Sequence, residues 1–328
     1  MEEHNHDLII VGAGPAGLCA ALYAGRSELD VVMLEAGVPG GQLLLTELVD
    51  DYPGLEDVGG FELVEKMSNH AKKFGVEATL GRVEKITRDD DGYFLIDIEG
   101  GARYRAPSVV FTAGGTPKRL EVPGEDKYMG KGVTYCAICD GAFFKGEKIA
   151  VIGGGDSAAE EGEFLTRYGS SVTLIHRREE LRAQAVLARR FIEHPKTDVI
   201  WNTVVEEIRG DDNGVTGLAL KNVETGEQSE LSVTGIFIFV GFTPNVETVG
   251  MHVEHDSGGY IKTDRDMRTS IPGFFVAGDV RSQLVRQITT AVGDATTAVF
   301  SAEKYLQELH DKTEGKVPPD LAQERQAV

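Results

Sequence analysis

Two glycine-rich loops, each between an apolar run and an expected helix, constrain the fold of this chain most. Residues 12–17 form a G-x-G-x-x-G loop after the run 7–11, and residues 153–158 form G-x-G-x-x-A after the run 148–152. Glycine permits the tight turn and lets a pyrophosphate approach the helix N-terminus, so this pattern is typical of dinucleotide sites. A second strand is expected after each helix, over 31–34 and 172–175. We therefore predict an α/β chain with two Rossmann-like dinucleotide-binding domains.

The two sites differ where the second strand ends, beside the expected adenosine ribose. In both sites the residue that ends the strand lies 23 residues after the first glycine of the loop. An acidic residue stands at this position in the first site, and a basic segment begins there in the second. A carboxylate accepts hydrogen bonds from ribose hydroxyls, whereas cations attract a 2′-phosphate, so we expect FAD at the first site and NADPH at the second. A solvated basic cluster is the alternative for that segment. The expected contact residues are Gly12, Gly14, Pro15, Ala16 and Glu35 for FAD, and Gly153, Gly155, Asp156, Ser157, Ala158, His176, Arg177, Arg178 and Arg182 for NADPH.

A Cys-X-X-Cys pair, Cys136 and Cys139, lies shortly before the second loop and is followed by Asp140. Such a pair closes a disulfide and opens it again, so it can store two electrons. The leaving thiolate needs a proton, and Asp140 is the candidate general acid, with a simple turn or cap residue as the alternative. A zinc site would need a second ligand pair nearby, so no metal is expected. The pattern indicates a chain that moves electrons from a nucleotide cofactor to a disulfide.

Charge and hydropathy limit the remaining function classes. The 328 residues carry a net charge of −20, which argues against nucleic acid and anionic membranes as partners. The apolar runs are interrupted well before the about 18 residues of a membrane span. The acidic N-terminus lacks the basic region of a secretory signal, so we expect a cytoplasmic protein.

Motifs spread over nearly the whole chain resemble those of the low-molecular-weight thioredoxin reductases. They are the two glycine-rich loops together with GGQL at 40–43, CAICDG at 136–141, HRR at 176–178, VGFTPN at 240–245 and VAGDV at 276–280. The resemblance implies a homodimeric flavoenzyme in which NADPH reduces FAD, FAD reduces the dithiol, and the dithiol reduces thioredoxin. A relative with another electron donor, such as ferredoxin, or with another dithiol target is the alternative enzyme. A nucleotide-binding redox sensor is the non-catalytic alternative.

The resemblance also implies a domain arrangement. Residues 1–117 and 246–328 would form a discontinuous FAD domain, and residues 118–245 an inserted NADPH domain that carries the dithiol, each built in three ββα layers. Proline and glycine near 117–124 and the segment 243–245 agree with two chain crossings. The family rotates one domain against the other, and these crossings would be the hinges.

Further cofactor contacts follow only from the resemblance. The implied FAD residues are Gly41, Gln42, Leu43, Asp51, Ala113, Gly114, Gly278, Asp279, Arg286, Gln287 and Ile288. Asp51 replaces an amide common in the family, and Asp279 could instead cap a helix. The helix after Ile288 is expected to reach about Leu309, and the polar tail beyond about Asp311 is expected to be disordered, with a cover over the partner subunit's flavin as the alternative.

By the same resemblance, Cys139 is the thiol that faces the flavin. Cys136 is then the interchange thiol that attacks the disulfide of the partner protein.

Overall fold

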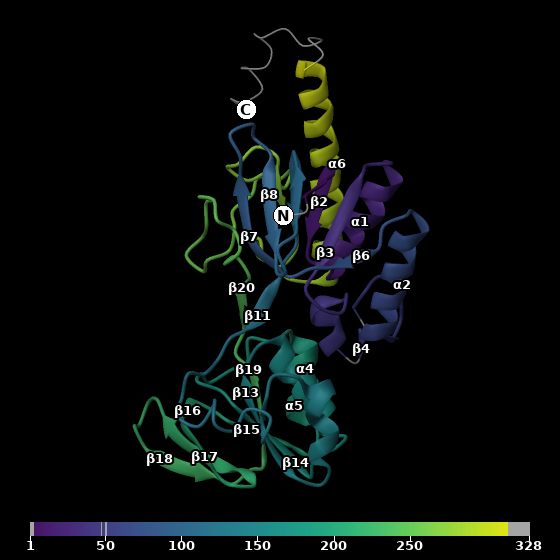
Figure 1. Cartoon of the computed structure of the whole chain (residues 1–328). Coiled ribbons are helices and arrows are strands. Elements are labelled where there is room, and N and C mark those ends of the chain that lie inside the picture. The colour runs from purple at the N-terminus through teal and green to yellow at the C-terminus, as the bar shows by residue number, and fades with distance from the viewer. Residues whose placement is uncertain (1–2, 47, 50, 314–328) are drawn as a thin grey trace. The chain divides into compact units, whose positions relative to one another are not determined.

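The computed structural model describes residues 3–46, 48–49 and 51–313, and the chain divides into two compact units (Figure 1). Unit 1 comprises residues 1–115 and 244–328, and unit 2 comprises residues 116–243. These boundaries lie two residues before the expected ones. Each unit is described separately below.

Unit 1 is built on a five-stranded parallel sheet in the order β21-β10-β2-β3-β6. The strands are β21 (Phe274–Val276), β10 (Ser108–Phe111), β2 (Leu8–Val11), β3 (Val31–Glu35) and β6 (Ala78–Leu80). Leu8 and Ile10 pack toward the helices, whereas Ile9 and Val11 pack toward a second sheet. Burial on both faces explains why these strands read as continuous apolar runs.

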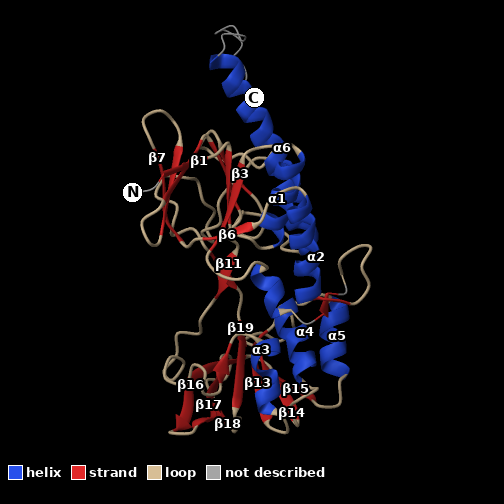
Figure 2. Cartoon of the chain, turned by 45° about the vertical axis from the view of Figure 1, so that its right-hand side comes forward, coloured by secondary structure: helices blue, strands red, loops and turns tan. Residues whose placement is uncertain are grey.

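Helices cover one face of this sheet and a smaller sheet covers the other (Figure 2). The helices are α1 (Pro15–Arg26), α2 (Gly60–Lys73) and α6 (Ile288–Thr313), with the short elements η1 (Gly41–Leu45), β4 (Leu48–Val49) and β5 (Val58–Gly59) beside them. The smaller sheet has the order β1-β9-β8-β7, from β1 (Glu3–Asn5), β9 (Arg103–Ala106), β8 (Phe94–Ile98) and β7 (Val83–Arg88). The layers are therefore sheet, sheet and helix.

Unit 2 repeats this plan. Its parallel sheet has the order β12-β19-β13-β14-β15, from β12 (Val133–Thr134), β19 (Gly235–Phe239), β13 (Lys148–Gly153), β14 (Ser171–Ile175) and β15 (Thr197–Ile200). Ile149 and Val151 pack on the helical side, while Ala150 and Ile152 face an antiparallel sheet. The helices are α4 (Asp156–Leu165) and α5 (Ala185–Glu193), and the antiparallel strands are β16 (Thr203–Asp211), β17 (Gly214–Asn222) and β18 (Gln228–Leu231). The short α3 (Ala137–Asp140) and η2 (Gly141–Phe144) follow β12.

Two short strands carry the chain between the units. They are β11 (Gly115–Pro117) and β20 (Phe242–Pro244), which pair with each other as a two-stranded ribbon. The fold prediction, an α/β chain with two Rossmann-like units, is confirmed.

Two expectations for the C-terminal part have different outcomes. Helix α6 continues to Thr313, so the expected end at about Leu309 is wrong by one helical turn. The rest of the expected tail, 314–328, lies outside the described residues. In the described part of the chain, no helix is long and apolar enough to cross a membrane.

Candidate redox and nucleotide sites

The first glycine loop closes tightly between β2 and α1. Gly12 has φ +99°, and a Cβ on it would stand 2.7 Å from the carbonyl oxygen of Thr112. A Cβ on Gly17 would stand 1.8 Å from the carbonyl oxygen of Gly12. Only glycine fits at these two positions. A loop without side chains here allows a pyrophosphate to approach the backbone at the N-terminus of α1.

Glu35 is the last residue of β3 and lies next to this loop. Its Oε2 accepts a hydrogen bond from Ala13 N at 2.8 Å, and its Oε1 accepts one from Gly37 N at 3.0 Å. A carboxylate has about four acceptor positions, so both oxygens keep capacity for ribose hydroxyls.

The segment after β3 folds back onto the loop. Gly41 lies against Gly14, because a Cβ on Gly41 would be 3.2 Å from the Gly14 Cα. Gln42 Nε2 donates to the Gly115 carbonyl oxygen at 3.0 Å, beside the expected residues Ala113 and Gly114. Leu43 is buried in the helical core of unit 1, and Asp51 is exposed.

Gly278 and Asp279 complete the first site after β21. Gly278 has φ +78°, and a Cβ there would stand 2.9 Å from the Ala16 Cβ, so the two expected segments meet. The Oδ1 atom of Asp279 is buried and has no hydrogen-bond partner in the described chain. Burial raises the pKa of the Asp279 carboxyl, while Arg286 acts in the opposite direction. An unsatisfied buried acceptor is costly, so this oxygen is suited to accept a hydrogen bond from a bound group.

The remaining expected FAD residues surround the start of α6. The Arg286 guanidinium lies over the Tyr260 ring, 3.9 Å from its centroid, and Gln287 N donates to Thr290 Oγ1. Ile288 is the first residue of α6. The sequence did not predict an ion pair that holds this region together. Arg281 pairs with the buried Asp294 at 3.0 Å, and Asp294 also accepts a hydrogen bond from Gly278 N. No local pattern marks that ion pair.

The second glycine loop has a closed part and an open part. A Cβ on Gly153 would lie 2.4 Å from the Phe239 carbonyl oxygen, close to Ala158, whereas nothing lies within 4 Å of a Cβ on Gly155. Asp156 begins α4 and its Oδ1 accepts from Gln184 N at 2.7 Å, with Ser157 following it in the first turn. Arg182 N donates to the Gly154 carbonyl oxygen at 2.7 Å. These bonds hold the basic segment against the loop.

His176 differs from its basic neighbours. Arg177, Arg178 and Arg182 are exposed, but His176 is 4% exposed and its ring fills the space that a Cβ on Gly154 would need. Burial lowers the pKa of His176, which favours the neutral ring. The cations available for a 2′-phosphate are the three arginines.

Cys136 and Cys139 form a disulfide at the turn between β12 and α3, with their Cα atoms 5.4 Å apart. Cys136 is the N-cap of α3, and its Sγ accepts a hydrogen bond from Cys139 N at 3.1 Å. This N–H would stabilise negative charge on the Cys136 sulfur. Cys136 is 9% exposed, whereas Cys139 is exposed.

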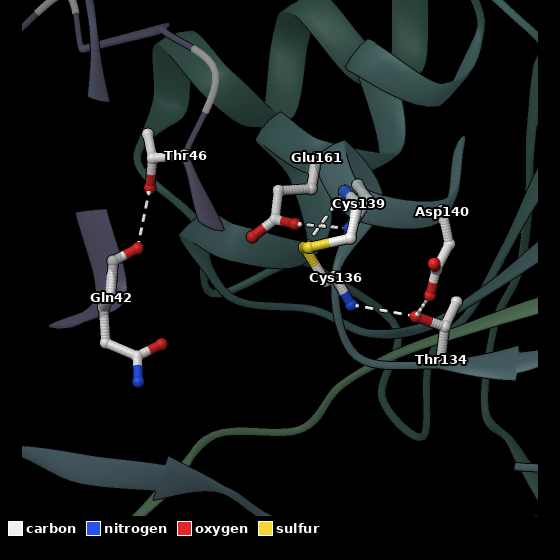
Figure 3. Close-up of a disulfide and its surroundings, with 8 residues drawn as sticks. Gln42, Thr46, Thr134, Cys136, Cys139, Asp140 and Glu161 are labelled. Atoms are coloured by element: carbon white, nitrogen blue, oxygen red, sulfur yellow. Dashed lines mark hydrogen bonds between the residues drawn. A yellow bond between two sulfur atoms is a disulfide. The ribbon is translucent and has the colours of Figure 1, made fainter. Parts of the chain in front are cut away.

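Asp140 reaches the cysteine pair through one hydroxyl. The Thr134 hydroxyl donates to Asp140 Oδ2 and accepts from Cys136 N at 3.1 Å (Figure 3). On the other side of the turn, Glu161 Oε2 accepts from Ala137 N at 3.3 Å. Thr134 and Glu161 were not expected from the sequence. No group of metal-ligating side chains occurs among the residues that the structure describes.

Known proteins match this chain over most of its length. The family model of the pyridine nucleotide-disulphide oxidoreductases matches residues 6–295. Thioredoxin reductase of Listeria monocytogenes is 45% identical over 315 residues, covering 96% of this chain and 98% of the relative. The crystal structure of Lactococcus lactis thioredoxin reductase has a TM-score of 0.90 at 46% identity, covering 92% of this chain and 99% of that one. A ferredoxin-flavin thioredoxin reductase from Clostridium acetobutylicum is more distant, with a TM-score of 0.51 and 27% identity over 94% of this chain and 99% of that one.

Proposed function

The chain belongs to the pyridine nucleotide-disulphide oxidoreductase family and, within it, to the thioredoxin reductases, and on this premise we propose how its residues divide the work. The cofactors are FAD and NADPH, and the reaction is the reduction of the thioredoxin disulfide by NADPH. The alternative with ferredoxin as donor has less support, because the match to the ferredoxin-linked enzyme is weaker than the match to the thioredoxin reductases above.

Unit 1 would hold FAD and unit 2 NADPH. The buried, unpartnered Asp279 oxygen and the closed loop at Gly12 fit a dinucleotide with hydroxyl donors. In unit 2 the open backbone at Gly155 and the exposed arginines of the segment 177–182 fit a phosphorylated ribose. Bound FAD supplies the relay of two electrons between NADPH and the disulfide.

The residues around the dithiol would then carry out disulfide exchange and protonate the leaving thiolate. Reduction with two electrons breaks the Cys136–Cys139 bond. When one of the two thiolates then attacks the thioredoxin disulfide, a thioredoxin sulfur leaves as a thiolate and needs a proton, and the Cys136–Cys139 bond forms again. We assign this proton to Asp140, whose carboxyl accepts a hydrogen bond from the Thr134 hydroxyl, and the same hydroxyl accepts the Cys136 N–H. The Cys139 N–H favours a thiolate on Cys136, in agreement with the interchange role that the family resemblance assigns to it. The observation that carries the proposal is this disulfide at the edge of a nucleotide-binding sheet.

The test is an anaerobic titration of the flavoprotein with NADPH and with NADH, followed by transfer to thioredoxin. We expect NADPH to bleach the flavin at lower concentration and thioredoxin to be reduced. The double variant Cys136→Ser, Cys139→Ser should still bleach but should not reduce thioredoxin. Reduction of thioredoxin by that variant would overturn the proposal.

We also propose a cytoplasmic homodimer. The support is the family resemblance, the exposed Phe300 on α6, and a recycled dithiol that suits a reduced compartment. The Phe300 ring lies against the half-buried Tyr23 on α1, with ring centroids 5.9 Å apart. Light scattering should give twice the mass of one chain, and Phe300→Glu should lower it. A monomeric wild-type protein at micromolar concentration would contradict the dimer.

A further inference from the structure

Glu161 is a second acidic group at the dithiol, on the side opposite Asp140. It lies on α4 and accepts the N–H of Ala137, the first residue of α3, at 3.3 Å. Ala137 is fully buried against α4, so the turn that carries both cysteines rests on this helix. Figure 3 shows the Glu161 carboxyl directed toward the turn, beside the disulfide. All of these residues belong to unit 2.

The surroundings of Glu161 disfavour its charged form. Burial raises the pKa of its carboxyl to about 8, with the Ala137 N–H acting in the opposite direction and Glu160 raising it further. Helix α4 packs against α3, α5, β13, β14 and β19. From α3 the titratable groups are the cysteines and Asp140, whose carboxylate is bonded to Thr134. Within the described chain, no charged group of the other four elements shifts the Glu161 pKa.

A reduced dithiol would place a second acid beside this carboxyl. The Cys136 sulfur already receives the Cys139 N–H, so Cys136 is the thiol whose charged form the turn favours. An ionised Glu161 and a Cys136 thiolate would be two like charges within one poorly hydrated region. Each charge would therefore disfavour the other, and the two groups would titrate as a coupled pair.

We propose that Glu161 is a positioning residue that keeps its proton beside the dithiol, so that the negative charge of this turn resides on sulfur rather than on the carboxyl. The inference rests on the proposed redox role of the Cys136–Cys139 pair and adds a group that controls when its thiolate forms. No covalent step is required of Glu161. Its proton stays on the carboxyl while a thiol loses one, and ionising the carboxyl first makes the thiolate harder to form.

The test measures thiolate formation directly, without NADPH or thioredoxin. The flavoprotein is reduced with excess dithiothreitol, freed of it under anaerobic conditions, and alkylated with iodoacetamide at pH 6 to 10. Mass spectrometry gives the rate at each cysteine. Glu161→Gln keeps an oxygen for the Ala137 N–H but carries no titrating proton. We expect the variant to alkylate about three- to tenfold faster between pH 8 and 9 and to follow a single ionisation, where wild type shows two coupled steps.

Two further variants distinguish the effect of the Glu161 proton from structural effects of a substitution in α4. Glu163→Gln, on the same helix, should follow the wild-type profile. Glu160→Gln removes a repelling charge, so the carboxyl of Glu161 should ionise at lower pH. The pH range in which alkylation is slowed should therefore begin at lower pH than in wild type. Superimposable profiles for wild type and Glu161→Gln would overturn the proposal, and if Glu161→Gln fails to fold, an unmoved Glu160→Gln profile would do so. Neither result bears on thioredoxin reduction, which the Cys136→Ser, Cys139→Ser variant tests separately.

Discussion

At the scale of single residues, the Thr134 hydroxyl links the acid to the reactive turn. It donates to Asp140 and accepts the Cys136 N–H, so one side chain fixes both the direction of the carboxylate and the backbone at the disulfide. The carboxyl that is proposed to supply the proton is therefore held beside the turn. The contribution of this proton can be separated from that of the hydrogen bond itself.

Asp140→Asn keeps an acceptor for Thr134 but cannot deliver a proton. We expect turnover with thioredoxin to fall by about 10²- to 10⁴-fold, the usual worth of a general acid. Bleaching of the flavin by NADPH should be unchanged, because that step does not use the dithiol. Stopped-flow absorbance under anaerobic conditions measures both. Asp212→Asn, an exposed aspartate of the same unit, is the control, and equal turnover in the two variants would remove Asp140 from the mechanism.

His176 should make stability depend on pH in a defined direction. Because burial lowers its pKa in the folded chain, the unfolded chain binds a proton at higher pH than the folded one. This contribution is present above about pH 6.5 and is lost as the pH falls below it, by at most about 1.4 kcal/mol per pH unit. Melting at pH 7.5 and 5.5 should therefore differ less in His176→Gln than in wild type. The exposed His252→Gln should behave as wild type, and a His176→Gln difference as large as that of wild type would refute the assignment.

At the scale of elements, the close contact between the loop and α1 decides whether the first site can form. A Cβ at position 17 would stand 1.8 Å from the backbone oxygen of Gly12, and the loop would have to open to admit it. Position 293, in the interior of α6, is a glycine as well, but nothing lies within 4 Å of a Cβ there. Gly17 and Gly293, both in helices of unit 1, therefore form a matched pair.

Gly17→Ala should lower the free energy of unfolding by about 1–3 kcal/mol, the cost of forcing extra volume into a packed site. It should also lower the flavin content per chain after purification. Gly293→Ala should instead raise stability by about 0.5–1 kcal/mol, because alanine is the better helix former. Urea unfolding and the flavin-to-protein absorbance ratio give both quantities. A Gly17→Ala protein with full flavin and unchanged stability would show that the loop is not closed in this way.

The central parallel strands and the glycine loops could be predicted from the sequence for a physical reason. Strands such as 8–11 are buried on both faces, which demands an unbroken apolar run, and the glycine loops have few alternatives at their positions. The contacts under the sites could not be predicted in this way. Glu161 meets Ala137 across 24 residues, and Arg281 meets Asp294 between a loop and a helix, so neither pair has a local pattern. The pattern HRR likewise could not separate the buried His176 from its exposed neighbours, because burial depends on packing against Gly154.

At the scale of the whole molecule, the ribbon of β11 and β20 is the covalent connection between the two units. Lys118 N donates to the Gly241 carbonyl oxygen at 2.8 Å, and Asn245 N donates to the Gly114 carbonyl oxygen at 3.0 Å. The residue numbers rise along one strand as they fall along the other, so the ribbon is antiparallel. Halfway between these bonds, Thr116 stands opposite Thr243, and both are exposed.

If the units rotate about this ribbon during turnover, as the family resemblance implies, a bridge across it should slow the enzyme. Paired residues of an antiparallel ladder have Cα atoms about 5.5 Å apart, close enough for a short crosslinker. In the variant Thr116→Cys, Thr243→Cys, a thioether-forming reagent can be applied while Cys136 and Cys139 are protected as their disulfide. The bridged protein should keep its flavin spectrum and its melting temperature but reduce thioredoxin more slowly than either single variant carrying the same reagent. Rapid-mixing kinetics would locate the slowed step between flavin reduction and dithiol oxidation. A bridged enzyme that turns over at the rate of the single variants would show that the ribbon does not act as the hinge.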